Sequence, residues 1–438
     1  MSKATNFKVF EIGSIPRELL QRRWPNFKWI DPELDSYVGS IIEEVKKQGD
    51  RALIRLTEKF DGAKLSVGDL RVTREEIDKA YKSVKKEWIS ALGSLKDRIE
   101  YLEKQRLERM NFESENLGVK FRFRAPPIRC VGCYVPGGKA AYPSTLVMIA
   151  TPARLAGVER VVVCSPPDSN GESDPLILVA ADLCQVEEIY KVGGAQAIAA
   201  LAYGTSSIKP VEKIVGPGNR YVTMAKILVS RDVATDAPAG PTEIIILADD
   251  IADPRLIALD LISQAEHGVD SMPILITTSK EIAEKVLNEV NKVVLSPGES
   301  KIAESLFTNG LIITCGNLDE AVDFVNEFAP EHLEVITREP MAVAEKVQSA
   351  GLVLIGPYTP VSASDYALGT NHVLPTGGFG RVFSGLSVFD FMKRVNIVEC
   401  SMEGLSKIRD HAKALAEAER LPNHALAVEG RFELERKA

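Results

Sequence analysis

The segment EIIILADDIADPRLIALDLISQAEHGVDSMPILIT, residues 243–277, decides the fold. Its two ends, 243–247 and 274–277, are short apolar runs rich in β-branched residues, as in strands that are buried on both faces. Between them, Asp253-Pro254 is a helix cap followed by proline at the first helical position. A helix over 254–266 between two such strands predicts a parallel sheet that is covered by helices.

The same alternation of short apolar runs and helical stretches extends from residue 130 to residue 355. Further strands are predicted at 160–164, 188–192, 213–215, 311–314, 333–336 and 352–355. Further helices are predicted at 152–156, 175–183, 195–203, 220–229, 280–290, 318–328 and 340–348. These strands are too many for one small sheet, so we expect two α/β domains that meet at the Pro/Gly cluster of residues 236–241.

Both flanks of this α/β region have the pattern of helices. Apolar residues recur at helical spacing over 32–62 and 74–110, and the charges of the second run are typical of a solvated face. Near the C-terminus, residues 405–420 are rich in alanine and end before Pro422, after which Asn423 can cap a second helix. This tail has few core residues of its own, so we expect it to dock on another surface.

Length and composition exclude several classes of protein. The 438 residues suggest about three domains, and 45% apolar with 26% charged residues is ordinary for a globular chain. A net charge of −8 without a basic stripe argues against a nucleic-acid partner. No secretion signal is recognisable, and no apolar run approaches the roughly 18 residues of a membrane helix. Six sparse cysteines indicate reduced thiols, so we expect a cytoplasmic protein without a membrane partner.

Three glycine-rich segments, 134–138, 192–196 and 215–219, follow strand-like runs. Each is typical of a tight connection between a strand and a helix, but three in one α/β domain also suit a nucleotide site at the carboxyl ends of strands. None is the standard dinucleotide fingerprint; for the segment 215–219, Tyr221 stands where the third glycine would be needed. The single CxxC motif of Cys130 and Cys133 could be a redox pair or half of a zinc site, although buried thiols are the commoner interpretation.

The chain has only five histidines, which makes their positions informative. Four of them lie beside acids, amides or turns: Gln264 with His267, Glu331 with His332, Asp365 with His372, and Glu419 with His424. Taken singly, each is equally typical of a helix end or a surface loop, and His411 is expected to face solvent. As a set, imidazole nitrogens with carboxylate and amide oxygens suit Zn²⁺ or a similar divalent ion. An adjacent carboxyl and imidazole also suit acid/base work.

Taken together, these segments resemble the histidinol dehydrogenase family, from residue 30 to the tail. The resemblance is densest in seven segments: YVPGGKAAYPS (134–144), VGGAQA (192–197), VGPGN (215–219), AGPTE (239–243), SQAEH (263–267), PEHL (330–333) and DYALGTNHVLPT (365–376). Several unrelated motifs in one order are far more specific than any motif alone.

The resemblance implies a role for individual residues. It implies one zinc ion per subunit, held by Gln264, His267, Asp365 and His424. It implies that NAD contacts Tyr134, Gln196 and Asn219. It implies that the substrate meets Thr242, His332, His372 and Glu419 together with the metal ligands. Glu331 and His332 would be the catalytic acid/base pair.

The resemblance also implies an architecture of two incomplete Rossmann-like, doubly wound domains with a helical N-terminal segment and C-terminal tail. The expected division is 1–25 as a segment packing with the tail, 26–133 with 242–386 as the metal and catalytic domain, 134–241 as the NAD domain and 387–438 as the helical tail. An intertwined homodimer would exchange this tail, so that Glu419 and His424 complete the partner's site.

The implied reaction is the last step of histidine biosynthesis: two hydride transfers to NAD that convert L-histidinol through L-histidinaldehyde to L-histidine. His332 would take the alcohol proton, and Glu331 would activate water on the aldehyde. One alternative is a dehydrogenase of the same fold for another small alcohol, such as a sulfonated diol. Two others are a zinc hydrolase with Glu331 as its base and a non-catalytic nucleotide-binding module. Thr242 replaces a serine that is common in relatives, and either residue offers a hydroxyl.

Overall fold

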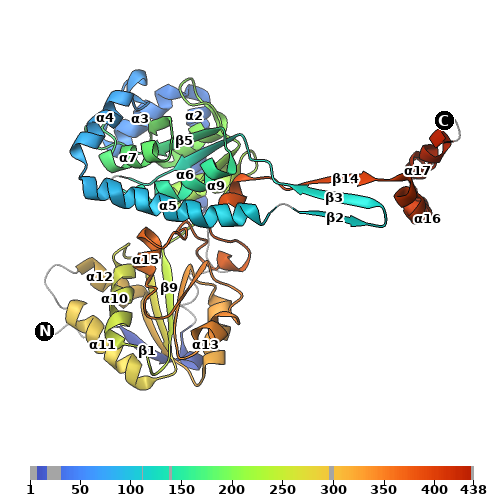
Figure 1. Cartoon of the computed structure of the whole chain (residues 1–438). Helices are drawn as coiled ribbons and strands as arrows, with labels where there is room; N and C mark the ends of the chain where they lie inside the picture. Colours follow the sequence, from blue (N-terminus) through green and yellow to red (C-terminus); the bar gives the residue numbers. More distant parts are fainter. Residues whose placement is uncertain (1–6, 17–30, 111, 138–140, 295–299, 436–438) are drawn as a thin grey trace. The chain divides into compact units, whose positions relative to one another are not determined.

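The computed structural model describes residues 7–16, 31–110, 112–137, 141–294 and 300–435. The chain divides into two compact units (Figure 1). The first unit comprises Met1–Glu103 and Ile128–Phe391, and the second comprises Lys104–Pro127 and Met392–Ala438. No described helix is long and apolar enough to cross a membrane.

The first unit contains a six-stranded parallel sheet that is built around the segment 243–277. Its strand order is β1 (Lys8–Glu11), β11 (Leu311–Thr314), β10 (Met272–Thr277), β9 (Glu243–Ala248), β12 (His332–Ile336) and β13 (Leu352–Ile355). Every residue of β9, β10, β11 and β12 is buried, as their apolar runs predict. Every pairing is parallel, so this part of the predicted α/β architecture is confirmed.

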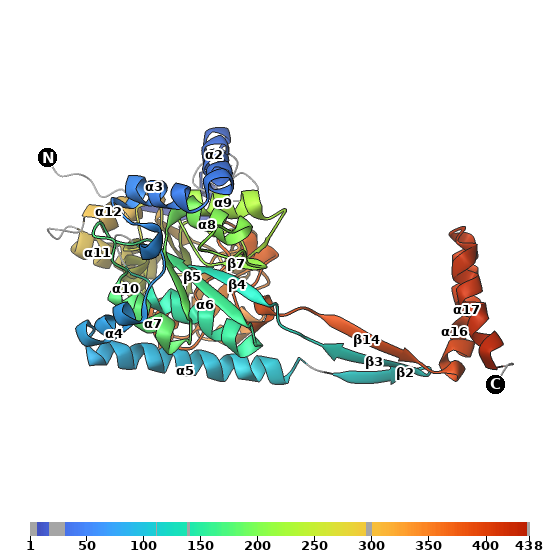
Figure 2. The ribbon, with the colours of Figure 1, turned by 90° about the horizontal axis from the view of Figure 1, so that it is seen from above.

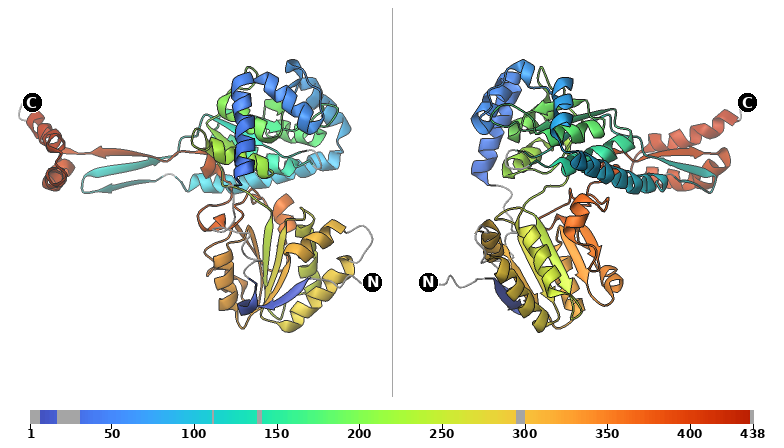
Figure 3. Two further views of the ribbon diagram at one scale, coloured as in Figure 1. Left: turned by 180° about the vertical axis from the view of Figure 1, so that it is seen from behind. Right: turned by 60° about the vertical axis from the view of Figure 1, so that its left-hand side comes forward.

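Helices cover both faces of this sheet, which explains why its strands are apolar throughout (Figure 3). One face packs on α10 (Pro254–Ala265), α11 (Lys280–Val294), α12 (Ser300–Asn309) and α15 (Val361–Tyr366). The other face packs on α13 (Leu318–Phe328) and α14 (Pro340–Ala344). Asp253 caps α10 by accepting a hydrogen bond from the Arg255 backbone N–H, as the Asp-Pro signal predicts.

A second parallel sheet in the same unit has five strands. Their order is β6 (Glu188–Lys191), β5 (Arg160–Ser165), β4 (Cys130–Tyr134), β7 (Lys213–Val215) and β8 (Ala234–Thr235). The accompanying helices are α6 (Pro143–Ala156), α7 (Pro175–Leu183), α8 (Gly194–Tyr203) and α9 (Arg220–Val229). Strand order reverses between β4 and β7, and ligands of doubly wound folds bind at such a switch point.

The N-terminal helices pack in a way that differs from the division predicted from the sequence. They are α2 (Pro32–Gln48), α3 (Asp50–Asp61), α4 (Arg74–Ser83) and α5 (Lys86–Glu108). The apolar faces of α2 and α3 belong to the core of the five-stranded sheet, together with α8 and α9. The division implied by the resemblance placed residues 26–133 with 242–386. Helical periodicity could not correct it, because periodicity identifies a buried face but not the sheet that it covers.

The structure also places two segments in strands that the sequence did not predict: residues 8–11 and the CxxC motif. Residues 8–11, assigned to a segment packing with the tail, pair with β11 at the edge of the six-stranded sheet, whereas 1–6 and 17–25 lie outside the described residues. Cys130 and Cys133 lie on the central strand β4, where residues three apart point to opposite faces. Both are free thiols, and their placement on opposite faces of one strand suits neither a disulfide between them nor a shared zinc ion.

The second unit contains an antiparallel three-stranded sheet and a pair of helices (Figure 2). The strands are β14 (Val395–Cys400), β3 (Val119–Arg124) and β2 (Glu113–Asn116), and the helices are α16 (Met402–Ala418) and α17 (Pro422–Glu435). The two helices were predicted. The expectation of a wholly helical tail over 387–438 was wrong, because Val388–Phe391 is a 3-10 turn of the first unit and 395–400 is a strand.

The hairpin between β2 and β3 turns through Leu117 and Gly118, which both have positive φ angles, 53° and 80°. Two consecutive positive φ values are typical of the type I′ turn that joins two-residue hairpins. A Cβ atom on Gly118 would lie 2.8 Å from the Gly404 Cα, so glycine is required where the turn approaches α16.

Candidate active site

The candidate site forms at the amino ends of two neighbouring strands of the six-stranded sheet. Thr242 directly precedes β9, and Glu331-His332 opens β12, which pairs with β9 through His332 and Ile244. Ala329, a buried residue with φ of 51°, ends α13 in the left-handed conformation and turns the chain toward Glu331. Sheet pairing thus brings together two motifs that are about ninety residues apart in the sequence.

The Glu331 carboxyl group is buried and oriented by two hydrogen bonds. Its Oε2 atom accepts one from Thr242 Oγ1 at 2.7 Å and one from the Glu243 backbone N–H at 3.0 Å. Burial raises the pKa of Glu331 to about 8, although these two hydrogen bonds oppose the shift. A carboxyl group with this pKa can exchange a proton close to neutral pH.

The His332 imidazole lies between two carboxyl groups and is 3% exposed. Its Nδ1 is 3.6 Å from Glu331 Oε2, and its Nε2 is 3.9 Å from Asp365 Oδ1. Neither nitrogen has a hydrogen-bond partner among the described residues. Burial lowers the pKa of His332 to about 4, so the ring is neutral at pH 7 and can accept a proton. Buried ring nitrogens of this kind call for a ligand or an ordered water.

Asp365 is the charged residue of the site and lies near the end of α15. Burial acts to raise its pKa, but the hydrogen bond with His372 and the charges of His332, His372 and His267 lower it overall. The His372 Nδ1 atom lies 3.6 Å from Asp365 Oδ1, while its Nε2 is 2.8 Å from Thr145 Oγ1. Asp365 therefore offers an ionised carboxylate beside two imidazoles.

Gln264 and His267 reach the same place from the C-terminal end of α10. The Gln264 amide nitrogen donates to Thr242 Oγ1, which leaves the carbonyl oxygen as its possible ligand atom. Gln264 is buried, whereas His267 lies just beyond the helix and is exposed. The Thr242 hydroxyl thus connects an expected metal ligand with the Glu331 carboxyl, a link that the sequence does not reveal.

The donor set fits a zinc ion. Gln264, His267 and Asp365 would supply an amide oxygen, an imidazole nitrogen and a carboxylate oxygen, and all three are atom types that zinc or similar divalent ions accept. Among the described residues, no three His, Cys, Asp or Glu side chains are gathered in a metal-holding group. The expected set does not need such a group within the first unit, because one of its donors there is the Gln264 amide.

The three residues expected to contact NAD lie along the carboxyl edge of the five-stranded sheet. Tyr134 ends β4 and its hydroxyl accepts a hydrogen bond from the Gly194 backbone N–H at 3.1 Å. Gln196 lies in the first turn of α8, is 1% exposed, and has no hydrogen-bond partner for either amide atom among the described residues. Asn219 caps α9 by accepting from Tyr221 and Val222. Tyr134 and Asn219 flank the β4–β7 switch point.

The loop that follows α15 contacts elements of both sheets at the site, and the sequence did not predict these contacts. Thr145, in the first turn of α6, meets His372, and Asn371 donates to the Met148 carbonyl oxygen at 2.6 Å. Glu243 accepts from the Gly377 backbone N–H at 3.1 Å. Neither Thr145 nor Glu243 stands out locally, because one begins an apolar helix and the other begins an apolar strand.

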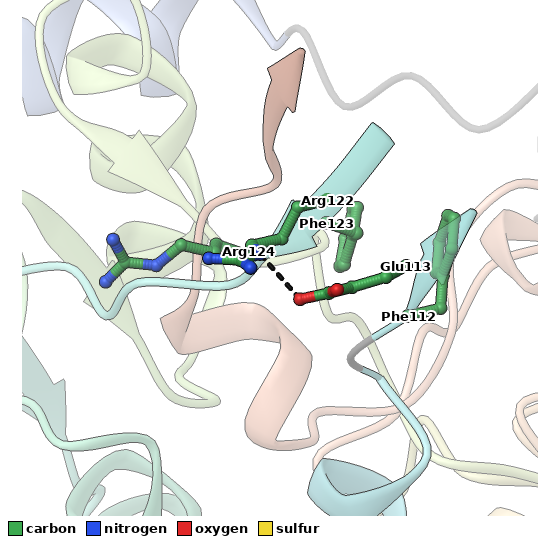
Figure 4. A pocket seen from close by; sticks show the side chains of 5 residues that line it. All are labelled: Phe112, Glu113, Arg122, Phe123 and Arg124. Carbon is green, nitrogen blue, oxygen red and sulfur yellow. Dashed lines mark ion pairs between the residues drawn. The ribbon is translucent and has the colours of Figure 1, made fainter. Parts of the chain in front are cut away.

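Glu419 and His424 belong to the second unit. Glu419 is the C-terminal cap of α16, and His424 lies in the first turn of α17. The same unit carries a pocket lined by Phe112, Glu113, Arg122, Phe123 and Arg124 (Figure 4). Its phenylalanine rings are stacked with centroids 5.5 Å apart, and Arg122 is paired with Glu113 at 2.6 Å. None of the predicted site residues lines this pocket.

Comparison with known proteins assigns the chain to a family. The model of the histidinol dehydrogenase family matches residues 29–432. A histidinol dehydrogenase of Methanocaldococcus jannaschii is 43% identical over 97% of this chain and 98% of its own length. One from Listeria monocytogenes is 46% identical over 92% of this chain and 94% of its own length.

A solved structure gives the same assignment from three-dimensional similarity. The crystal structure of histidinol dehydrogenase from Elizabethkingia anophelis superposes with a TM-score of 0.93 at 37% identity, covering 99% of this chain and 100% of that one. Because the similarity in sequence and in structure extends over nearly the whole length, the chain belongs to the histidinol dehydrogenase family.

Proposed function

We propose that this protein is a zinc- and NAD-dependent histidinol dehydrogenase that oxidises L-histidinol through L-histidinaldehyde to L-histidine. The observation that carries the proposal is the buried Glu331–His332 pair beside an ionised Asp365, in a chain that the family model covers from residue 29 to residue 432. An acid/base pair next to a possible metal ligand is the machinery that oxidation of an alcohol needs.

In the first oxidation, His332 acts as the base. An unpartnered nitrogen of its neutral ring accepts the proton of the substrate hydroxyl as hydride leaves the carbon. The ionised Asp365, 3.9 Å from Nε2, stabilises the imidazolium that forms. NAD⁺, when bound, supplies the hydride acceptor.

In the second half of the reaction, Glu331 acts on water. Its carboxylate takes a proton from the water molecule that adds to the aldehyde carbon, while the His332 imidazolium returns its proton to the aldehyde oxygen. The neutral His332 can then accept a hydroxyl proton of the hydrate in the second oxidation. Thr242 and the Glu243 backbone hold the Glu331 Oε2 atom in one place for this step. Burial of both catalytic side chains limits escape of the aldehyde to solvent.

Gln264, His267, Asp365 and His424 would hold the zinc ion. Zinc, when bound, would orient the substrate through its imidazole and amine. Thr242, His372 and Glu419 would contact the substrate as well, and Tyr134, Gln196 and Asn219 would contact NAD. The buried Gln196 amide supports the NAD assignment, since a buried amide without a protein partner calls for a ligand or water.

The protein acts as a homodimer in this proposal, with Glu419 and His424 completing the partner's site. Two strands of the second unit support a dimer, because every residue of β2 and β14 is exposed in the single chain. Large apolar side chains are also exposed on its two helices and in the connection between them: Leu415, Leu421 and Leu426. Such surfaces are typical of an interface with another chain. The six free cysteines fit a reducing compartment, and we place the reaction in the cytoplasm.

Turnover of L-histidinol with NAD⁺ tests the proposal, with L-histidine measured as the product. Oxidation of histidinol at rates far above those with small sulfonated diols is the expected result. Turnover of the diols alone would favour a dehydrogenase of the same fold with another substrate, and no NADH from any alcohol would overturn the proposal.

A further inference from the structure

A second pair of carboxyl groups, Asp260 and Glu334, lies within the six-stranded sheet domain. Glu334 follows His332 by two residues on β12 and is 2% exposed. Its Oε1 atom accepts a hydrogen bond from the Val361 backbone N–H at 2.6 Å. Its Oε2 atom finds no hydrogen-bond donor among the described N–H and O–H groups, and the neighbouring carboxyl group of Asp260 on α10 is the group that can form a hydrogen bond with it. Two carboxyl groups can form this bond only when one of them carries a proton.

The pair connects the three elements that carry buried residues of the candidate site. On β12, His332 and Glu334 are two apart and face the same side of the sheet. On α10, Asp260 and Gln264 are four apart and lie on one face of the helix. On α15, Val361 and Asp365 have the same spacing. Each of the three elements therefore carries one residue of the candidate site. Each also carries a second residue on the same face, two positions away in the strand or four in a helix, that belongs to the carboxyl pair or contacts it.

The contact with Val361 compensates for a missing helix cap. Pro360 occupies the cap position of α15, and its side chain accepts no hydrogen bond. Glu334 accepts from the first backbone N–H of the helix instead, across from the strand. Asp365 lies one turn later on the same helix. α10 and α15 also contact each other directly (Figure 1).

Burial of the Asp260 and Glu334 carboxyl groups favours their protonated forms, which supports a proton shared between them. It raises the pKa of Asp260 to about 6 and that of Glu334 well above the ordinary value. Two adjoining carboxyl groups in a poorly solvated place do not both ionise, so the first proton is held firmly.

We propose that Asp260 and Glu334 are positioning residues for the metal site, which hold α10, β12 and α15 so that Gln264, His332 and Asp365 converge. This inference rests on the proposed zinc site. A pair that served only the stability of the domain would leave zinc affinity unchanged in folded variants. Hydrogen-bonded groups behind metal ligands typically contribute tenfold or more to affinity.

Three variants separate positioning from stability. Glu334→Gln keeps an acceptor for Val361 and gives Asp260 a donor without any shared proton. Glu334→Leu removes both bonds at similar volume. Val286→Ala is the matched control, because Val286 is fully buried in the same core on α11, which carries no site residue. The affinity of the full-length protein for Zn²⁺ is measured against a chromophoric chelator, and thermal unfolding is followed in parallel.

We expect Glu334→Leu to weaken zinc binding by about tenfold or more, and Glu334→Gln to stay within about threefold of the parent. Val286→Ala is expected to lower the melting temperature and leave zinc affinity unchanged. If Glu334→Leu does not fold, Asp260→Leu is measured in its place; it removes only the contact of Glu334 with α10 and is also expected to weaken zinc binding. Unchanged zinc affinity in the folded leucine variant would overturn the positioning role. Absence of zinc binding by the parent would instead overturn the zinc site itself.

Discussion

His332 Nδ1 lies 3.6 Å from Glu331 Oε2, and burial moves the pKa values of these consecutive residues in opposite directions. The pKa of Glu331 rises to about 8 and that of His332 falls to about 4, so the ordinary order of a carboxyl and an imidazole is reversed. Near neutral pH the pair therefore combines a neutral imidazole with a carboxyl group poised between its two forms. This arrangement suits two consecutive proton transfers by different groups.

Replacing Glu331 by glutamine should affect catalysis more than binding. The amide keeps the bond from Thr242 but cannot take a proton from water, so we expect the rate of histidine formation to fall by about 10²- to 10⁴-fold. Zinc content should stay at the parent level. Glu327→Gln, an exposed position on the preceding helix, is the control and should keep full activity. An unimpaired Glu331→Gln variant would remove Glu331 from the mechanism.

The raised pKa of Glu331 also predicts how stability depends on pH in the zinc-free protein. Its folded-state pKa of about 8 exceeds the ordinary value of 4.5, so the folded protein binds this proton more tightly than the unfolded chain. The resulting contribution to the free energy of unfolding is fully present below pH 4.5 and is lost as pH rises through 8. The loss is at most about 1.4 kcal/mol per pH unit for one group.

Urea unfolding at a series of pH values measures this effect. The parent should lose stability between pH 5 and pH 8 relative to Glu331→Gln, which has no proton to lose. Parallel curves for the two proteins would show that Glu331 ionises normally.

Removing the exposed metal ligand should remove the metal. His267→Asn is expected to lose zinc, because the remaining donors of one chain are an amide and a single carboxylate. Elemental analysis of the purified protein gives the zinc content, and His411→Asn on α16 serves as the control. A variant that retains one zinc per chain would show that His267 is not a ligand.

Mixed dimers test the exchange of the tail between subunits. A chain with His424→Asn lacks a ligand for its partner's site, and a chain with His332→Asn lacks a base in its own site. Both homodimers should be inactive, whereas refolding the two chains together should restore one intact site in each mixed dimer. Activity that stays absent in verified mixed dimers would place His424 in the site of its own chain or outside the site.

Much of the α/β architecture could be predicted from the sequence, since strands buried on both faces are continuous apolar runs. The strands at 213–215, 311–314 and 352–355 have the predicted bounds. Strands that lack this signal were missed: residues 113–116 are exposed and polar, and residues 8–11 form a short edge. The helices within residues 31–61 were predicted, but their packing on the five-stranded sheet was not. Helical periodicity identifies the buried face of a helix and not the sheet on which that face packs.

Residues of the candidate site could be predicted only where histidines lie close in the sequence to acidic or amide residues. Gln264, His267, Glu331, His332, Asp365 and His372 could be named from the sequence, and the fold brings them together. The connections between them could not be predicted, because Thr145 to His372 and Asp260 to Glu334 join distant segments. Neither Thr145 nor Glu334 differs in its local sequence from an ordinary core residue.

The most direct test of the central claim is the amount of NADH formed per histidine from L-histidinol, with and without a zinc chelator. Two oxidations at one site predict two NADH per histidine, no accumulation of free aldehyde, and loss of the signal on chelation with recovery when zinc is returned. One NADH per substrate with the aldehyde as product, or no NADH with zinc and NAD⁺ present, would contradict the account.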